Sequence, residues 1–181
     1  MDKRERILEV AEELFLTNSI ENTSVNQITR QAHVAKGTFY LYFEDKDELV
    51  FEIVNRFVDK TIIKALEKAS TEDWLESFFK TLIDFYCREP AVLKLLYEPL
   101  FLQADRPDRY DEKLCHFAPL IDRLVQEGYR PESAKIKLAL AMETLGTLCF
   151  LSIILEKPAP IEKTQHEIIR MATSVFQKGG L

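Results

Sequence analysis

Glycine and proline are scarce in this chain, with 5 glycines and 7 prolines among 181 residues. Runs in which apolar and polar residues alternate, the pattern of a half-buried strand, are also rare. Apolar residues nevertheless make up 46% of the chain, enough to bury a sizeable core. The sequence therefore predicts an all-α fold.

The chain also lacks the residue patterns of metal sites and of common enzymes. Its three cysteines, Cys87, Cys115 and Cys149, are widely spaced and form no CxxC pair, which argues against zinc and against a disulfide framework and fits a reducing cytosol. The three histidines are far apart, and no Gly-rich phosphate loop, HExxH or GxSxG motif is present. We expect neither an enzyme nor a cofactor or metal.

Nothing in the sequence predicts export or a membrane span. The opening MDKRERILE is charged and amphipathic, unlike a signal peptide. Residues 138–155 form an apolar run with a single charge, Glu143, whose 18 residues reach the lower limit for crossing a bilayer. Because no basic cluster marks an inner end, we expect a buried helix of a cytoplasmic protein.

Acidic residues are absent from one stretch of an otherwise acidic chain. Asp and Glu number 30 and the net charge is −6, which argues mildly against nucleic acid. Residues 22–43, however, contain no acid, although they include Arg30 and Lys36. A local surface without acids suits a polyanionic partner.

Apolar spacing predicts about nine helices, three short ones followed by longer ones. A cap at Thr23 or Ser24 would open the second, and Asp45 with Glu48 would form a capping box for the fourth. The sixth is expected to kink or end near Pro99. The expected ranges are 3–16, 25–32, from 36 through the aromatic residues to 43, 45–68, 71–88, 92–101, a seventh that includes Phe117 and closes at Gly128, 131–155 and 161–177.

The second and third helices, joined by a tight turn, have the outline of a helix-turn-helix, whose second helix enters the DNA major groove. His33 stands in the turn where glycine would be expected, and histidine tolerates a positive φ. Phe39 and Phe43 are four residues apart, so they share a helix face and should pack into the core. The intervening residues then face elsewhere.

Several side chains on this outer flank can contact DNA. The hydroxyls of Thr38, Tyr40 and Tyr42 can donate to phosphates, and Tyr40 and Leu41 can touch thymine methyl groups. Gly37 lets backbone approach a phosphate closely. The candidate DNA-binding residues are Ser24, Asn26, Gln27, Lys36, Gly37, Thr38, Tyr40, Leu41, Tyr42 and Lys46.

The segment from Thr23-Ser24-Val25 through VAKGTFYLYFEDKDEL resembles the DNA-binding signature of the TetR/AcrR family of transcriptional regulators. By this resemblance Thr38, Tyr40, Tyr42 and Lys46 match positions that typically contact DNA, and Ser24, Lys36 and Gly37 match positions that often do. The sequence departs from the family pattern in three places. Asn26 stands where a basic residue is common, Ala35 where a serine cap is common, and His33 where glycine is common.

The resemblance implies an all-helical homodimer with two domains, expected at residues 1–46 for DNA binding and 47–181 for ligand binding and dimerisation. It further implies a repressor that binds a palindromic double-stranded DNA operator and is released by a small apolar or amphipathic effector. Ligand bound between the fifth and eighth helices would move the fourth helix and change the separation of the DNA-reading helices.

Two sets of residues are expected to serve these roles in the larger domain. The apolar and aromatic side chains of the middle helices can line a ligand pocket, although the simpler interpretation is that most of them are core. The last two helices carry more apolar residues than one buried stripe needs and can form a four-helix bundle with a second copy, although a monomer with an internal eighth helix stays open. The pocket candidates are Trp74, Phe78, Tyr86, Tyr97, Phe101, Phe117 and Met142, and the dimer candidates are Leu148, Leu151, Ile154, Ile168, Ala172 and Phe176.

Two other classes of function compete with a regulator. Catalysis is disfavoured only by missing motifs, which is soft evidence. A helical binding module that has lost DNA binding would fit the negative net charge of the chain and the lack of a basic residue at position 26, which is Asn26.

Overall fold

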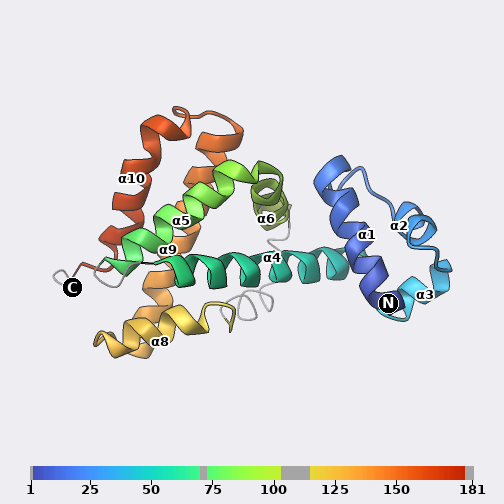
Figure 1. Ribbon diagram of the computed structural model, residues 1–181, viewed down its shortest axis with the longest axis horizontal. Coiled ribbons are helices and arrows are strands. Elements are labelled where there is room, and N and C mark those ends of the chain that lie inside the picture. The colour runs from blue at the N-terminus through green and yellow to red at the C-terminus, as the bar shows by residue number, and fades with distance from the viewer. Residues whose placement is uncertain (1, 70–72, 103–114, 178–181) are drawn as a thin grey trace. The chain divides into compact units, whose positions relative to one another are not determined.

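The chain is helical throughout the part that the structure describes, a computed structural model covering residues 2–69, 73–102 and 115–177. Side chains are described for these residues except 98–102. The helices found there are α1 (Lys3–Asn18), α2 (Val25–Gln31), α3 (Lys36–Tyr40), α4 (Lys46–Lys68), α5 (Trp74–Arg88), α6 (Pro90–Leu102), α8 (Ala118–Gln126), α9 (Pro131–Cys149), the π-helix η1 (Phe150–Ile154) and α10 (Ile161–Ser174) (Figure 1). The expected all-α class is confirmed.

The chain forms two compact units, Met1–Phe57 and Val58–Leu181, whose boundary falls inside α4. The sequence predicted a domain boundary at residue 46. The N-terminal unit extends beyond it and includes the first part of α4. Leu49, Val50 and Ile53 in that part are at most 1% exposed. They supply the apolar surface that three short helices lack by themselves.

Local signals set the ends of α2. Ser24 caps its start, because the Ser24 side chain accepts from the Gln27 backbone N–H while the Gln27 side chain accepts from the Ser24 N–H at 2.8 Å. The neighbouring Thr23 is 1% exposed and donates instead to the Ser19 carbonyl at 2.8 Å. Of the two expected caps, Ser24 is therefore the one used.

The turn after α2 is a Schellman motif with histidine in the position that usually holds glycine. His33 has φ of 53°, and its N–H donates to the Arg30 carbonyl. The next N–H, of Val34, donates to the Thr29 carbonyl at 3.0 Å. This pair of bonds satisfies the last carbonyls of the helix and places α3 at a fixed angle. The positive φ expected of His33 is confirmed.

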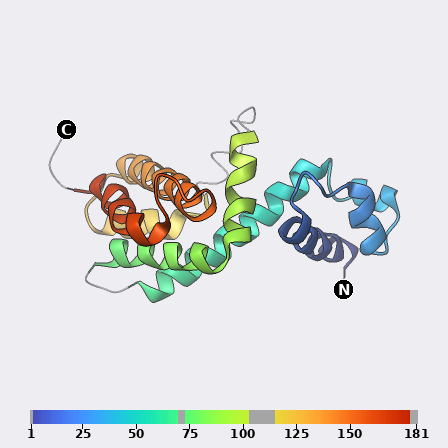
Figure 2. The same cartoon turned by 90° about the horizontal axis from the view of Figure 1, so that it is seen from above.

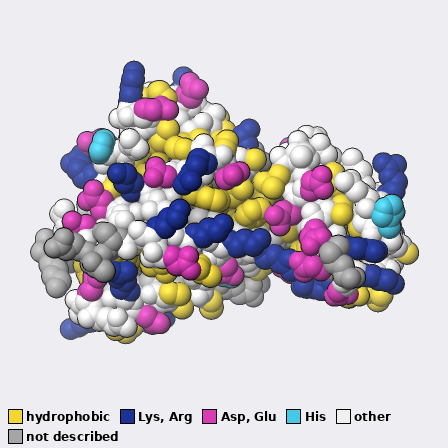
Figure 3. Space-filling model, in the orientation of Figure 1, with side chains coloured by type: hydrophobic (Ala, Val, Ile, Leu, Met, Phe, Trp, Pro, Cys, Tyr) yellow, Lys and Arg dark blue, Asp and Glu magenta, His cyan; other side chains and the backbone are white. Residues whose placement is uncertain are grey.

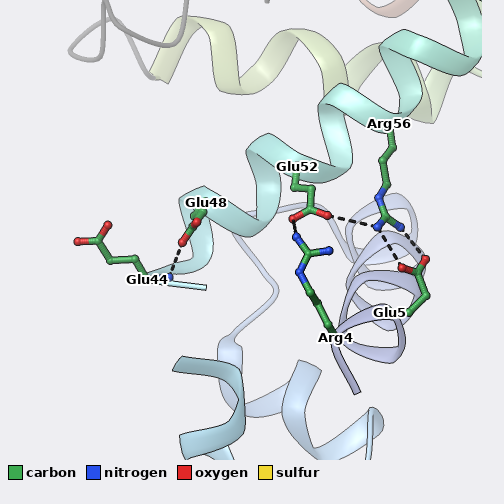
Figure 4. Close-up of polar contacts among 6 residues, drawn as sticks. All are labelled: Arg4, Glu5, Glu44, Glu48, Glu52 and Arg56. Atoms are coloured by element: carbon green, nitrogen blue, oxygen red, sulfur yellow. Dashed lines mark hydrogen bonds and ion pairs between the residues drawn. The ribbon is translucent and has the colours of Figure 1, made fainter. Parts of the chain in front are cut away.

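The start of α4 is capped by acidic side chains. Asp45 accepts from the Glu48 N–H at 2.8 Å, as expected of a capping box. The Glu48 carboxylate accepts from the Glu44 N–H, one residue earlier than the usual partner (Figure 4). The acids also suit the positive end of the helix dipole.

An ion-pair cluster ties α1 to α4. Arg56 donates to both carboxylate oxygens of Glu5, at 2.6 and 3.0 Å, and to Glu52 at 3.2 Å (Figure 4). Arg4 pairs with the same Glu52. The hydrogen bond and charge of Glu5 outweigh burial and raise the pKa of Arg56. Because these side chains are partly exposed, the cluster fixes the angle of the helices more than it adds stability.

In the second unit, α10 packs against α9 and α5, and α8 packs against α9 (Figure 2). The core of this unit holds Phe78, Phe79, Leu82, Leu138 and Leu145, all at most 1% exposed. α6 continues past Pro99 to Leu102, one residue beyond the expected end. The expected eighth helix is α-helical only to Cys149 before it widens into η1.

The combined helix at residues 131–154 has the length and mean hydropathy of a membrane span, and is the one such helix among the described residues. Of its most apolar window, 39% is buried inside the protein. Its buried residues, such as Leu138, Ala141 and Leu145, belong to the core shared with α8 and α10. The helix therefore serves as a core element, with one apolar face still exposed.

Candidate nucleic-acid interface and the helical core

The short helix α3 is held by two aromatic side chains. Phe39 and Phe43 are 0% and 1% exposed, with ring centroids 5.5 Å apart. The Arg4 guanidinium lies 5.4 Å from the centre of the Phe43 ring. A helix of five residues gains little from its own backbone, so this packing is what fixes its orientation.

The opposite flank of α3 is open to solvent within the N-terminal unit. Tyr40 is 52% exposed and Leu41 is 81% exposed, although both are large apolar side chains. Lys36 and Gly37 are exposed, and Thr38 and Tyr42 are half-buried. Six of the ten candidate DNA-binding residues thus lie in one short stretch that is at least partly exposed, which we call the α3 flank: Lys36, Gly37, Thr38, Tyr40, Leu41 and Tyr42.

Gly37 has no structural reason to be glycine. A Cβ atom built on it would meet no atom within 4 Å, and its φ is not positive. Helix interiors disfavour glycine by about 1 kcal/mol relative to alanine. A bare backbone at this position leaves room for a partner from outside the chain.

Of the other four candidates, three have side-chain partners within the chain. Ser24 and Gln27 bind each other in the α2 cap, and Asn26 is exposed beside them. The Lys46 ammonium donates to the carbonyls of Ile20 and Thr23 at 2.9 and 3.1 Å, which fixes the loop before α2. An ammonium has three donors, so one N–H group of Lys46 is left for a phosphate. The sequence pattern gave no sign of this internal role.

The aromatic candidates of the second unit are mostly core. Trp74, Phe78, Tyr86, Tyr97 and Met142 are at most 9% exposed. Phe117 is half-buried at the start of α8, and the side chain of Phe101 lies outside the described residues. The five buried side chains come from α5, α6 and α9, so the fold does gather them in one unit.

Within this core a pair of tyrosines provides buried polar atoms. The rings of Tyr86 and Tyr97 are perpendicular with centroids 6.5 Å apart, and their hydroxyls share a hydrogen bond. Burial raises the pKa of both phenols, so they stay protonated. A Cβ atom at Gly146 would lie 1.4 Å from the Tyr97 hydroxyl oxygen, so only glycine admits Tyr97 here. Sequence reasoning missed Gly146 because the residue across from a helix cannot be read from its spacing.

The dimer candidates divide into two groups. Leu148, Leu151 and Ile154 are half-buried, whereas Ile168, Ala172 and Phe176 are at most 7% exposed within one protomer. Phe176, for example, stacks edge-on with Tyr129 at 6.2 Å. The stripe expected on the last helix therefore faces inward. The apolar side chains left exposed on these helices are Ile136, Leu140 and Met171.

Comparison with known proteins places the N-terminal unit. Residues 7–53 match the family model described as bacterial regulatory proteins, tetR family. The chain is 35% identical over 65 residues to the HTH-type transcriptional regulator YuxN of Bacillus subtilis (strain 168), whose own function is uncharacterised. It is 36% identical over 58 residues to an HTH-type regulator of Staphylococcus aureus (strain USA300). These matches cover 36% and 32% of this chain and only 22% and 31% of those proteins.

Solved structures resemble the whole chain. A transcriptional regulator from Aquifex aeolicus VF5 is 26% identical, with a TM-score of 0.60 over 97% of this chain and 100% of that one. FadR from Bacillus subtilis in complex with stearoyl-CoA shares the fold at 17% identity, with a TM-score of 0.63 over 96% and 99% of the two chains. The family model, the regulator sequences and the shared fold agree: residues 7–53 carry the helix-turn-helix domain of the tetR family, and the whole chain has the fold of solved TetR-family regulators.

Proposed function

We propose that this protein is a transcriptional repressor that binds a palindromic operator as a homodimer and is released by a small effector. The TetR family is one of DNA-binding regulators and not of enzymes. The proposed role puts the protein in the cytoplasm, where the DNA lies.

The α3 flank carries this proposal. It presents exposed Tyr40 and Leu41 and the bare backbone of Gly37 within a 22-residue stretch that has no acid. Hydroxyl, lysine and backbone N–H groups contact phosphates, whereas apolar atoms contact thymine methyl groups. Large apolar side chains are exposed to water here, as is typical of a binding surface. The absence of acids nearby avoids repulsion of DNA phosphates. Lys46 acts mainly by fixing the loop before α2 and offers its remaining N–H to a phosphate.

A second copy supplies the other half of the operator contact. Ile136 and Leu140 are four residues apart on α9 and 60% and 55% exposed, and Met171 of α10 is 48% exposed. An apolar helical surface of this kind is typical of a twofold four-helix interface. Leu151 and Ile154, which follow α9 in η1, are half-buried and can add apolar surface.

The effector binds in the second unit, where Trp74, Tyr86, Tyr97 and Met142 offer apolar surface and two phenol hydroxyls. FadR of Bacillus subtilis, which has the same fold, holds stearoyl-CoA. Stearoyl-CoA is thus a reasonable first probe for this chain. An effector acts only through its different affinity for the two forms of the protein, and a coupling of about 1–3 kcal/mol lowers operator affinity about 5- to 150-fold.

Selection of bound sites from a random duplex pool tests the proposal. We expect an enriched palindrome, because a twofold dimer reads two related half-sites. Binding to the selected duplex, followed by fluorescence anisotropy, should fall steeply between about 50 and 200 mM salt. Enrichment of no sequence, together with no salt-dependent binding, would contradict the proposal.

A pair of variants locates the contact. Lys36→Gln should weaken operator binding and reduce the dependence of log K on log salt by about one phosphate contact per subunit. Lys94→Gln removes a matched exposed charge on α6 of the other unit and should leave binding unchanged. Equal loss from both variants would show that net charge, and not the α3 flank, drives binding.

A further inference from the structure

A groove with cationic walls lies between α4 and α5 of the second unit, apart from the tyrosine pair. Its volume is about 230 Å³, and it is partly open to solvent. Thr61, Lys64, Ala65 and Lys68 line it from α4. Spacings of three and four residues place these four side chains on one face of the helix. The opposite wall comes from α5 and the residue after it, with Thr81, Phe85, Arg88 and Glu89.

The charge of this groove is opposite to that of the chain. Lys64, Lys68 and Arg88 bring three positive charges against the single carboxylate of Glu89, in a protein whose net charge is −6. Lys and Arg side chains gather on the surface over α4 and α5 (Figure 3). Cations on two facing helices focus an electrostatic field that attracts anions.

The three cations are not engaged by acids in the described part of the chain. Neither Lys64 nor Lys68 forms an ion pair there, and Arg88 donates only its Nε, to the Asp84 carbonyl at 2.9 Å. The planar end of the Arg88 guanidinium is therefore left to face the groove or the solvent. Guanidinium groups bind carboxylate and phosphate through two parallel hydrogen bonds.

The floor of the groove is apolar and shielded. Ala65 is 1% exposed, Thr61 is 5% exposed, and Phe85 is half-buried at the wall. Thr81 donates its hydroxyl to the Ser77 carbonyl at 2.8 Å, which turns the threonine methyl and oxygen to fixed positions. A ligand here meets charge at the rim and apolar atoms below.

From these features we infer that the α4–α5 groove binds a small amphipathic anion, a carboxylate or phosphate attached to a short apolar or aromatic group. The volume is below the range of about 300–1,000 Å³ that holds a drug-sized ligand. The site therefore takes a compact molecule. The anionic group pairs with Lys64, Lys68 and Arg88, and the apolar group rests on Ala65 and Phe85. This inference stands apart from the proposed operator binding, since it concerns a surface of the second unit alone.

Isothermal titration of the full chain with phenyl phosphate tests the inference. Inorganic phosphate and phenol, which carry the anion and the ring separately, are the comparison probes. We expect phenyl phosphate to bind at least tenfold more tightly than either, with affinity that falls as salt is added. No binding of phenyl phosphate, or equal binding of inorganic phosphate, overturns the inference. Hexanoate in a parallel titration shows whether the site prefers a carboxylate or a phosphate.

Charge variants show where the probe binds. The double variant Lys64→Gln/Lys68→Gln should weaken phenyl phosphate binding tenfold or more. The double variant Lys80→Gln/Lys94→Gln removes the same charge from exposed positions outside the groove and should change affinity less than twofold. All four lysines are exposed, so circular dichroism should show unchanged helix content. Equal loss of affinity in both double variants would assign binding to overall charge and overturn the inference. Because no DNA enters the assay, failure here leaves the operator proposal intact.

Discussion

At the scale of single residues, the α3 flank is defined by contrast between neighbours. Phe39 is fully buried while Tyr40, the next residue, is 52% exposed. A helix turns by about 100° per residue, so the side chains of Phe39 and Tyr40 leave the helix in different directions. Gly37 on the same helix has open space where a Cβ would be. The sequence predicted which side of α3 is buried, and the structure agrees.

A substitution at Gly37 should change stability and DNA binding in opposite directions. Gly37→Ala should raise the free energy of unfolding by about 0.5–1 kcal/mol, because alanine favours the helix and meets no atom. The same methyl group should weaken operator binding if DNA backbone passes close to residue 37. Urea denaturation and anisotropy on the selected duplex measure the two effects. A variant that is more stable and binds as well as the wild type would remove Gly37 from the interface.

The three cysteines should differ in reactivity. Burial raises the pKa of the Cys149 thiol to about 12, so its thiolate is scarce at pH 8, and the side chain is 0% exposed. Cys87 and Cys115 are exposed. Only thiolates react rapidly with iodoacetamide. We expect mass spectrometry to find native protein labelled at Cys87 and Cys115 but not at Cys149, which should react only in denaturant.

The buried thiol also makes stability depend on alkaline pH. The ordinary pKa of 9.0 applies to Cys149 in the unfolded chain, so between about pH 9 and 12 unfolding releases its proton. Its contribution to stability is complete below pH 9 and is lost as pH rises through this window. In the labelling experiment described above, equal labelling of all three cysteines in native protein at pH 8 would contradict the burial of Cys149.

At the scale of elements, ends are decided by local chemistry and faces by packing. The caps at Ser24 and Asp45 and the stop at His33 follow from residues three or four apart, which is why the sequence predicted them. The sequence did not predict that α9 would widen into η1. A π-helical turn departs from the regular backbone ladder of an α-helix, and apolar spacing along the chain gives no sign of it.

A substitution in the turn that ends α2 should make the protein more stable. His33→Gly should raise the free energy of unfolding by up to about 1 kcal/mol, because glycine adopts a positive φ without the steric penalty of a Cβ. His33→Ala keeps that Cβ and should give no gain. Thermal unfolding of both variants at one protein concentration measures the difference. A loss of stability in His33→Gly would mean that the imidazole makes a contact worth more than the strain.

At the scale of the whole molecule, the proposed dimer rests on apolar side chains that one copy leaves uncovered. The sequence predicted that the last helix contributes Ile168, Ala172 and Phe176 to the interface. These side chains are instead buried in the core of a single protomer. The exposed apolar atoms lie instead on Ile136, Leu140 and Met171. Exposed apolar side chains concentrated on neighbouring helices are typical of protein interfaces.

A charge placed on this surface should separate the copies. Leu140→Glu should convert the dimer to a monomer and abolish tight operator binding, since burying an unpaired carboxylate is costly. Ile63→Glu changes an apolar residue on α4 that is 53% exposed, similar to Leu140 at 55%, and should leave the dimer intact. Light scattering after size exclusion measures the mass. A dimeric Leu140→Glu variant, or a monomeric wild type, would refute this interface.

The sequence by itself determined the all-α class, the helix-turn-helix and the buried and exposed sides of α3, because these depend on spacing along one segment. The tertiary structure decided what covers each helix: the first part of α4 completing the N-terminal unit, Tyr97 lying over Gly146, Lys46 bound to the loop before α2, and the inward face of α10. Periodicity shows that a helix has an apolar face. Whether that face meets the same chain, a second copy or a ligand depends on residues far away in sequence, which come together only when the chain folds.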